Sequence, residues 1–527
     1  MLAFISNIDK YSRIASEAWH SKSSLYLAIA IAWVTYFIIT VRKGRKTADF
    51  PLINPARGFE LFDRGRRKHF VANAQRIIKD GCKQYPNQCF NVMTDMGVTT
   101  IIPNDMVDAI RNNPNLSFTG AVAEDMHAHI PGFEPFASGT RTDELLQAVV
   151  QYHLTQHLSK MVKPLSDETS YAVDLRFGTS TDWKTVAPHP DIVNIIARVS
   201  SRAFLGLDVC RNEEWLDLSS SYALKSFLAG ASLRQWSPWM RNIVHHFHPQ
   251  CKQIRDQRTR AMEIIQPVLE KRQQERSLAQ ARGEEVPRFD DAIDWAEEEA
   301  KGHEYDPAAL QMTLSLAAVH TTTTLMLKTL LQLAKMPELV SELRQEMAEV
   351  ISVHGWSKQS LVSLRLLDGT LKEMLRMQPG SIVHLTRLAT ADVVLPTGDV
   401  LPKGSRSLCT GELKYSSSQF EDPGRFDPHR YLAWRGTDRD HLSHLVSTSP
   451  AMLGFGYGLH ACPGRFFASN EIKIMLCHIL MKYDWKIAPE TQSTEPLAQG
   501  LRLVANMFAK VEFRRRDKPE IDLDAIE

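Results

Sequence analysis

The longest uninterrupted apolar run of this chain lies close to the N-terminus. Residues 24–41 read SLYLAIAIAWVTYFIITV and include no charged side chain. A run of this length meets the lower limit for a helix that crosses a bilayer. Arg42, Lys43, Arg45 and Lys46 follow directly, and basic residues concentrate on the cytosolic side of such spans. The pattern therefore predicts a membrane anchor followed by a cytosolic body.

A cleaved signal peptide is the alternative interpretation of this run. The run is longer than the apolar part of a signal peptide, and no small-residue cleavage site follows it. Residues 49–58 contain Pro51 and Pro55 and indicate a stiff linker. The predicted division of the chain is a lumenal segment (1–23), the anchor (24–41), a basic and proline-containing linker (42–58), a body (59–513) and a charged, solvated tail (514–527).

The body has a mainly helical pattern over residues 140–385, with a long amphipathic stretch at 261–280 and a solvated loop at 282–287. A long, largely apolar helix is expected over 308–335, although it contains four consecutive threonines at 321–324. Threonine lowers helix propensity because β-branching restricts χ1, so these four residues indicate a local role. Short strands are expected near 98–102 and on both sides of Thr397 and Gly398. The stretch 413–465 resembles a loop, and a final helix is expected over 466–483. The predicted fold class is mainly α with small β-sheets.

Composition narrows the functional classes. The 527 residues include 62 Lys+Arg and 61 Asp+Glu, a net charge of +1, which excludes a chain-wide basic surface for nucleic acid. The hydrophobic fraction of 43% is sufficient for a large core. The seven cysteines are widely spaced and include no CxxC pair. This spacing excludes a disulfide scaffold and a zinc ribbon, and it indicates a reducing compartment.

One cysteine stands in a sequence that indicates chemistry. Residues 455–468 read FGYGLHACPGRFFA, so Cys462 lies in a glycine-rich turn before an apolar helix. Backbone N–H groups and a helix N-terminus favour the thiolate at such a position. Glycines let the backbone approach a flat group closely, and Phe455 could cover the sulfur. Such a thiolate is suited to binding haem iron; the alternative is a buried structural cysteine.

At these residues the chain resembles the cytochrome P450 superfamily, and specifically its fungal, membrane-anchored members that include ent-kaurene-oxidase-like enzymes. The motif is F-x-x-G-x-H-x-C-x-G, formed by Phe455, Gly458, His460, Cys462 and Gly464. The resemblance implies the cytochrome P450 fold and heme b, with Cys462 as the axial ligand of the iron. Most members have arginine where this chain has His460. The role implied for this residue is a hydrogen bond to a haem propionate.

A second match is the pair Glu373 and Arg376, whose spacing places both side chains on one helix face. Such pairs are usually surface ion pairs that contribute little stability. In this family they resemble the E-x-x-R of a buried structural triad. The third member is implied to be Arg430 in the F-x-P-x-R stretch at 426–430. The triad is implied to hold the cysteine loop in place.

A third match lies in the threonine-bearing helix, where residues 317–322 read AAVHTT. The family pattern is [AG]-G-x-[DE]-T-T, so Thr321 matches the threonine that guides protonation of bound oxygen, and Thr322 follows it. His320 replaces the usual acid. An imidazole can relay a proton near neutral pH, but it could equally contact substrate or face a neighbouring loop. Ala317 is implied to line the substrate pocket.

The fourth match is Arg387, which resembles a strand arginine that pairs with a haem propionate. The family often uses a W-x-x-x-R in an early helix for the same purpose. This chain departs from that pattern, because residues 149–157 contain neither tryptophan nor arginine. Gln151, His153 and His157 are the alternatives for that role.

The resemblance implies insertion of oxygen from O2 by hydroxylation, repeated in some members at one carbon. No dinucleotide-binding glycine fingerprint occurs in the chain, so electrons must come from a separate protein. The implied partners are an NADPH–cytochrome P450 reductase and, as a further donor, cytochrome b5, at the endoplasmic reticulum membrane. No nucleic-acid partner is expected.

The expected substrate is an apolar polycyclic terpenoid, meroterpenoid or polyketide intermediate of fungal secondary metabolism. Phe133 and Phe136, in a stretch that resembles those enzymes, are candidate pocket residues; the alternative is that they only pack a loop. Three alternatives to a monooxygenase are considered. The protein could be a haem-thiolate isomerase or peroxygenase, a non-catalytic haem-binding membrane protein, or a cysteine hydrolase that pairs Cys462 with His460. The last lacks a third orienting group.

Overall fold

The computed structural model describes residues 26, 27, 29, 31–33, 47–56 and 63–526. The predicted lumenal segment, most of the predicted anchor and part of the linker lie outside these residues. Within the described part of the chain, no helix is both long enough and apolar enough to span a bilayer.

Helices form most of the body, as predicted. In chain order they are α2 (Arg64–Gln84), α3 (Val107–Ile110), α4 (Phe118–Asp125), α5 (Glu134–Ser138), α6 (Leu145–Ala148), α7 (Leu158–Phe177), α8 (His189–Cys210), α9 (Glu213–Leu233), α10 (Pro238–Phe247), α11 (Pro249–Arg282), α12 (Ala292–Ala300), α13 (Pro307–Leu333), α14 (Pro337–His354), α15 (Lys358–Ser363), α16 (Arg365–Met377), α17 (His429–Trp434), α18 (Asp440–Ser443) and α19 (Arg465–Lys482). Short 3-10 turns are η1 (Asn104–Met106), η3 (Glu412–Tyr415), η4 (Gly458–His460) and η5 (Leu523–Ala525), and η2 (Val149–Leu154) is a π-helical turn.

The strands form small sheets. They are β1 (Phe90–Thr94), β2 (Gly97–Ile102), β3 (Leu116–Ser117), β4 (Lys184–Val186), β5 (Val383–Ala389), β6 (Val393–Val394), β7 (Val400–Leu401), β8 (Arg406–Thr410), β9 (Tyr483–Ile487), β10 (Leu497–Gln499), β11 (Arg502–Val504) and β12 (Val511–Arg515). The largest sheet has five strands in the order β1-β2-β8-β5-β3. Its β2 and β8 are parallel, with Thr99 beside Arg406. This pairing brings the segment before α4 next to the segment after α16.

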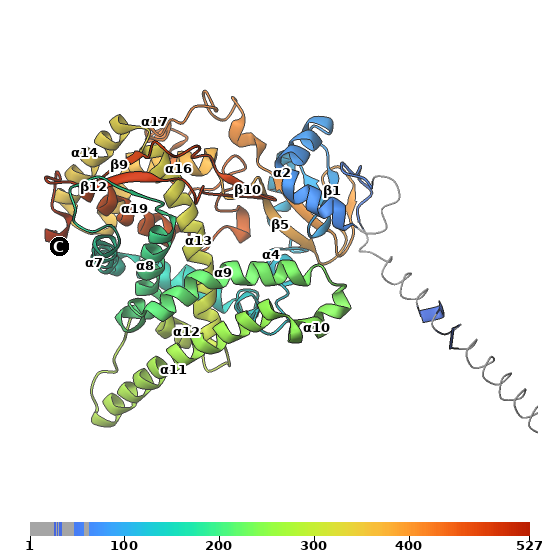
Figure 1. Cartoon of the computed structure of the whole chain (residues 1–527), viewed down its shortest axis with the longest axis horizontal. Coiled ribbons are helices and arrows are strands. Elements are labelled where there is room, and N and C mark those ends of the chain that lie inside the picture. The colour runs from blue at the N-terminus through green and yellow to red at the C-terminus, as the bar shows by residue number, and fades with distance from the viewer. Residues whose placement is uncertain (1–25, 28, 30, 34–46, 57–62, 527) are drawn as a thin grey trace, which may run out of the picture.

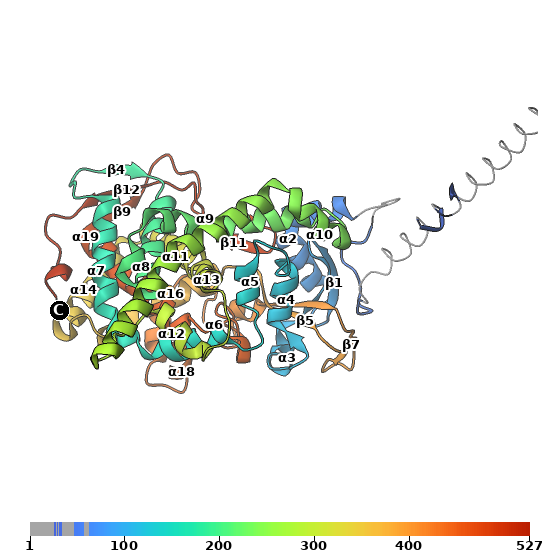
Figure 2. The same cartoon turned by 90° about the horizontal axis from the view of Figure 1, so that it is seen from below.

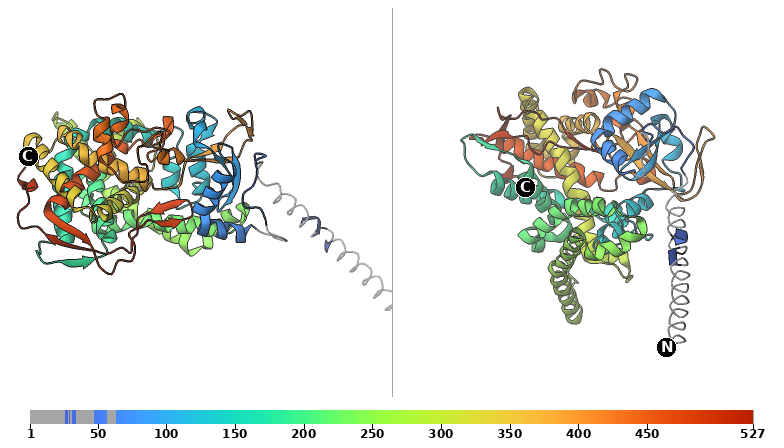
Figure 3. Two further views of the ribbon diagram at one scale, coloured as in Figure 1. Left: turned by 90° about the horizontal axis from the view of Figure 1, so that it is seen from above. Right: turned by 45° about the vertical axis from the view of Figure 1, so that its right-hand side comes forward.

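Helix α13 runs through the centre of the body, and the five-stranded sheet with α2 lies at one end (Figures 1 and 2). Helices α7, α14 and α19 lie at the opposite end, and α11 extends beyond the other helices (Figure 3). The apolar side chains of α13 join the largest core cluster together with those of α7, α8, α9, α16 and α19. The largely apolar composition of α13 therefore follows from its central position.

Three of the four consecutive threonines of α13 bond their hydroxyl groups to the helix backbone. Thr321, Thr323 and Thr324 each donate to the carbonyl four residues earlier, over 2.7, 2.7 and 2.9 Å. This back-bonding lets a helix bury threonine without an unpaired hydroxyl. The helix begins with the Asp306 side chain accepting from the Ala309 N–H over 2.9 Å.

Several element predictions are confirmed and one is wrong. Strands β6 and β7 lie on both sides of Thr397 and Gly398, and α19 matches the last predicted helix. The C-terminal tail, however, is not simply solvated. Strand β12 continues to Arg515, which pairs with Asp174, and Leu523 is buried. The charges of this segment find partners in the body: Arg515 pairs with α7, Arg514 and Arg516 with Asp484 of β9, and Asp524 with Lys482 of α19. The composition of the tail therefore misled the sequence prediction.

Candidate active site

Cys462 lies between η4 and the start of α19, and its side chain is half-buried. Its N–H donates to the Phe455 carbonyl over 2.7 Å, which closes the loop on itself. The Gly456 N–H donates to the Leu453 carbonyl over 2.9 Å. These backbone bonds hold the sulfur in one position relative to α19.

Two of the three predicted loop glycines adopt left-handed backbone conformations, with φ of 71° at Gly456 and 77° at Gly458. A Cβ at Gly458 would lie 2.3 Å from Asn112 Oδ1. Glycine is needed there because Asn112 occupies that space and accepts from the Leu459 N–H over 2.8 Å. The close approach at Gly458 is thus made by the protein itself. At Gly464 φ is −85°, and no left-handed conformation is required.

The electrostatic surroundings of Cys462 are mixed. Burial raises the pKa of its thiol, while the backbone N–H groups of Gly464 and Arg465 and the charge of Arg465 act in the opposite direction. These donors come from the first residues of α19 and its N-cap, where N–H groups lack helical partners. They are placed to stabilise a thiolate once a positive iron compensates the burial.

Arg387, Phe118 and His460 converge near the cysteine loop. The Arg387 guanidinium carbon lies 5.9 Å from the Phe118 ring centroid, and the Phe118 and His460 ring centroids are 6.2 Å apart. Phe118, the first residue of α4, was not identified from the sequence. Sheet pairing places it there, because β3 pairs with β5 immediately before α4 begins.

The Arg387 guanidinium is only partly satisfied by the protein. It is buried, and its Nη1 donates to the Thr386 carbonyl over 2.9 Å. Its Nε and Nη2 have no hydrogen-bond partner among the described residues, and burial lowers its pKa to about 10. Two unused donors beside the exposed imidazole of His460 fit an anionic group such as a haem propionate.

The predicted early-helix substitutes fall into two groups. His153 Nε2 is 2.9 Å from Glu299 Oε1, and His157 Nδ1 is 2.8 Å from the His153 carbonyl. Both rings stack on Trp295 of α12, so neither is directed to a propionate. Gln151 is exposed. Of the three candidates it alone is not engaged with α12.

One stripe of α13 is open although the helix is otherwise embedded. Ala317 and Thr321 are exposed, while Ser315, Val319 and Thr322 around them are buried. The two exposed residues are one turn apart, and Thr321 Oγ1 donates to the Ala317 carbonyl over 2.7 Å. The predicted catalytic threonine and the predicted pocket alanine thus share one accessible face, and Thr322 points into the core.

His320 is directed toward α9. Its Nε2 donates to the Ser220 carbonyl over 2.7 Å, and burial lowers its pKa. The neutral form of the imidazole is therefore favoured. Of the alternatives considered above, this geometry corresponds to contact with a neighbouring element, which is a helix here.

The predicted triad is assembled around a fully buried carboxylate. Arg376 donates through Nε and Nη2 to the two oxygens of Glu373, over 2.8 Å each, and Arg430 Nε donates over 3.2 Å. Tyr431 adds a hydrogen bond from its hydroxyl over 2.9 Å. Tyr431 was missed because only the arginine of that stretch belongs to the motif.

The triad arginines also hold η3 and the polypeptide segment that follows it. Arg376 Nη1 donates to the carbonyls of Lys414 and Pro423 over 2.8 Å each, and Arg430 Nη1 donates to Glu421 over 2.6 Å. The cysteine loop contacts the same helix at another point. A Cβ at Gly454 would lie 2.6 Å from Leu375 Cγ, so the loop packs closely on α16.

Phe133 and Phe136 lie on different sides of the same aromatic cluster. Phe133 is fully buried, with its ring 6.2 Å from that of His127. Phe136 is 6.3 Å from the ring of Phe227 on α9. Helix α5, which carries Phe136, contacts α13 through the Thr313 hydroxyl, which donates to the Pro135 carbonyl over 2.6 Å.

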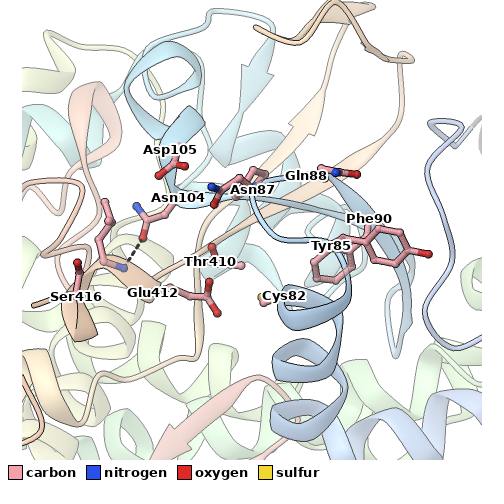
Figure 4. Close-up of a pocket in the computed structure, with 12 residues that line it drawn as sticks. Cys82, Tyr85, Asn87, Gln88, Phe90, Asn104, Asp105, Thr410, Glu412 and Ser416 are labelled. Atoms are coloured by element: carbon pink, nitrogen blue, oxygen red, sulfur yellow. Dashed lines mark hydrogen bonds between the residues drawn. The ribbon is translucent and has the colours of Figure 1, made fainter. Parts of the chain in front are cut away.

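A separate cavity of about 200 Å³ lies between the end of α2, the start of β1 and η3. Its walls include Cys82, Tyr85, Asn104 and Glu412, and Figure 4 shows these side chains. Burial and the Glu412 carboxylate raise the pKa of the Cys82 thiol to about 12, so it is not a nucleophile at neutral pH. This cavity contains none of the predicted site residues.

The fold and the site together define a haem-thiolate oxidoreductase. The cysteine loop, the open threonine of the central helix, the buried carboxylate–arginine triad and the two unused arginine donors are the parts that such a protein requires. The sequence model of the family described as Cytochrome P450 matches residues 143–509.

Curated proteins with similar sequences carry names of the same kind. Cytochrome P450 monooxygenase eqxH of Fusarium heterosporum is 39% identical over 498 residues, which cover 94% of this chain and 95% of that protein. Cytochrome P450 monooxygenase adrA of Penicillium rubens is 39% identical over 494 residues, which cover 93% of this chain and 96% of that protein. Cytochrome P450 monooxygenase 1 of Gibberella fujikuroi is 40% identical over 439 residues, which cover 83% of this chain and 99% of that protein. The chain belongs to the cytochrome P450 family.

Membership of this family makes the chain a monooxygenase that uses thiolate-ligated heme b. Cys462 is the residue of this chain that fits the ligand position. The haem supplies the redox chemistry that activates dioxygen. With the haem bound, Cys462 would supply the thiolate, Arg387 would offer its unused donors to the anionic edge of the cofactor, and Thr321 Oγ1 would hold a hydroxyl proton.

Proposed function

We propose that this monooxygenase hydroxylates an apolar polycyclic terpenoid, meroterpenoid or polyketide intermediate of fungal secondary metabolism. The observation that carries the proposal is the accessible face of Ala317 and Thr321 on the otherwise buried α13. A small apolar side chain beside a single hydroxyl leaves room for a bulky ring system and offers one proton donor to it. The fungal relatives, all named as monooxygenases, support the choice of pathway class.

The proposed role of Thr321 is proton delivery. Its hydroxyl donates to the Ala317 carbonyl, and this bond can be exchanged for one directed into the site because the helix surface is open there. His320, held against Ser220, supports the backbone at the adjacent position. Residues of this chain therefore hold and move the proton, and the surrounding apolar side chains exclude water.

The proposed electron donor is an NADPH–cytochrome P450 reductase, with cytochrome b5 as an additional donor. We propose that both meet this protein at the cytosolic face of the endoplasmic reticulum membrane, to which residues 24–41 anchor it. The support for the anchor is the uncharged run followed by four basic residues.

The carbon-monoxide spectrum tests whether Cys462 binds the haem iron, and product formation tests whether NADPH and reductase or peroxide drive the reaction. Reduced protein with carbon monoxide should show the Soret shift of a thiolate-ligated haem, and Cys462→Ala should abolish it. Product formation from a panel of terpenoid and polyketide intermediates should require NADPH and reductase. Turnover with peroxide alone would instead favour the peroxygenase alternative.

Thr321→Ala separates a monooxygenase from a haem-binding protein without turnover. Because general acid–base groups contribute about 10²–10⁴-fold, we expect product formation to fall by at least about tenfold. Thr321→Ser, which keeps the hydroxyl, should retain most of the activity. An unchanged rate in the alanine variant would contradict the proposed role.

A further inference from the structure

Arg502, the first residue of β11, is a cation in an unusual position. Its side chain is exposed, yet burial lowers its pKa because protein surrounds the guanidinium. Within the described part of the chain, this guanidinium forms no hydrogen bond and no ion pair.

An aromatic ring lies against this guanidinium. The Arg502 guanidinium carbon lies 4.1 Å from the ring centroid of Phe227 on α9. The Phe227 ring is in turn 6.3 Å from that of Phe136, a candidate substrate-pocket residue. Arg502 therefore lies at the end of a row of aromatic rings that reaches α5, the helix that contacts α13 through Thr313.

The backbone around Arg502 is held firmly. Arg502 pairs with Ser381 in an isolated β-bridge, and the Ser381 hydroxyl donates to the Leu501 carbonyl over 2.9 Å. The preceding Gly500 has a φ of 60° and donates to the Val71 carbonyl over 3.2 Å. Because this segment is already ordered, ligand binding costs little backbone conformational entropy.

The charge of the Arg502 guanidinium also influences His320 on α13. This charge contributes to the lowered pKa of His320, the residue before Thr321. His320 contacts Ser220 on α9, and Phe227 lies two turns further along the same helix. The inner face of α9 thus connects the catalytic stretch of α13 with Arg502.

The nearby acidic group does not neutralise Arg502. The charge of Asp95 is felt at Arg502, but the Asp95 carboxylate lies 3.9 Å from Arg234 Nη2. Among the described residues, Asp95 therefore forms an ion pair with Arg234 and none with Arg502. An unpaired guanidinium on an aromatic ring matches the planar, two-oxygen geometry of a carboxylate.

We propose that Arg502 selects substrates that carry a carboxylate, and that it binds this group against Phe227 while the apolar rings extend toward Thr321. This inference rests on the proposed hydroxylation of a polycyclic compound and narrows its substrate class to acids. Arg502 is then a specificity-determining residue of this chain, located away from the oxygen-activating residues.

The test compares an acid with its uncharged ester in the purified holoprotein. Dehydroabietic acid and its methyl ester share one ring system, and the Soret change reports binding of either. We expect the acid to bind about tenfold or more tightly than the ester in the wild type, as one charge-assisted pair provides. Arg502→Gln should remove this preference, and Arg502→Lys should retain part of it.

The matched control is Arg288→Gln, which removes an exposed arginine in the loop before α12 and should keep the preference. Equal binding of acid and ester by the wild type would overturn the role of Arg502 while leaving the polycyclic substrate class intact. Failure of both compounds to bind a protein with a normal thiolate carbon-monoxide spectrum would overturn the substrate class as well. Loss of acid and ester binding by the same factor in Arg502→Gln would also overturn selection by charge.

Discussion

Two buried arginines, Arg376 and Arg387, have contrasting surroundings. Arg376 is bonded at every nitrogen: Nε and Nη2 donate to Glu373, and Nη1 donates to two carbonyls. Arg387 is buried to a similar degree, but its Nε and Nη2 have no partner among the described residues. Both positions carry a buried guanidinium, but the fold supplies hydrogen-bond partners for all three nitrogens only at Arg376.

The difference indicates which buried charge serves the fold and which serves a ligand. Burial lowers the pKa of both arginines, but the hydrogen bonds and charge of Glu373 reverse this at Arg376 and leave its pKa raised. At Arg387 burial prevails, and the pKa falls to about 10. Desolvating a charge without a partner costs several kcal/mol. A fold that retains such a group at a site leaves it ready for an anionic cofactor edge.

The largest effect is expected from removing the completed arginine. Arg376→Ala leaves the Glu373 carboxylate buried without its bidentate partner, which should cost about 3–5 kcal/mol of unfolding free energy. Denaturant unfolding followed by circular dichroism measures this cost. Arg260→Ala, which removes an exposed arginine paired with Glu214 and Glu263, is the control and should leave the midpoint near the wild-type value. A similarly small shift for Arg376→Ala would contradict the scaffold role.

Arg387→Ala should have the opposite profile. The protein loses an incompletely paired charge, so unfolding of the apoprotein should change little, whereas haem affinity should fall by about 10–100-fold with the loss of a charge-assisted bond. Titration of the apoprotein with haem measures the affinity, and unfolding of the same sample measures the stability. Arg387→Lys should recover part of the affinity. A lower stability with unchanged haem affinity would show that Arg387 is a scaffold residue after all.

The sequence identified the side chains whose partners are close along the chain. Cys462 with its glycines and the pair Glu373 and Arg376 are local patterns, and the structure brings the pair together with Arg430 as expected. Helix α13 was equally recognisable, because a long apolar stretch has few alternatives to burial.

Residues supplied by distant segments could not be predicted in the same way. Phe118 reaches Arg387 through pairing of β3 with β5, and Asn112 occupies the space beside Gly458. The sequence offers His153 and His157 as partners of a haem propionate, but in the structure both rings stack on Trp295 of α12. These contacts depend on tertiary pairing, and no local motif records them.

A smaller effect is expected at Tyr431, which tests whether the scaffold carboxylate needs every donor. Tyr431→Phe keeps the ring and removes the hydroxyl that donates to Glu373 Oε2 over 2.9 Å. Loss of one hydrogen bond to a buried charged group should cost about 1–3 kcal/mol. The denaturation midpoint measures the change. A double variant with Arg376→Ala should show non-additive costs, because both donors bind the same carboxylate; simple additivity would contradict this coupling.

The smallest effect concerns His127, a buried residue whose Nε2 also lacks a partner among the described residues. Its ring contacts Phe133 and not the cysteine loop. Unlike Arg387, this unpaired group should therefore affect the stability of the fold and not the binding of haem. Burial, together with Arg241 and Arg234, lowers its pKa to about 4. The unfolded chain, with an ordinary histidine pKa of about 6.5, therefore binds a proton that the folded chain does not.

This difference fixes the sign of the pH dependence. The contribution of neutral His127 to stability is complete above about pH 6.5 and is lost as the pH falls toward 4, with a slope of at most about 1.4 kcal/mol per pH unit. His127→Asn removes the titrating group and suits the left-handed backbone there, where φ is 53°. Unfolding free energies measured from pH 7 to 5 should therefore decline less steeply in this variant. Phe133→Leu, which disturbs the same contact without removing a proton site, should keep the wild-type slope; equal slopes in wild type and His127→Asn would show that this histidine is already protonated in the fold.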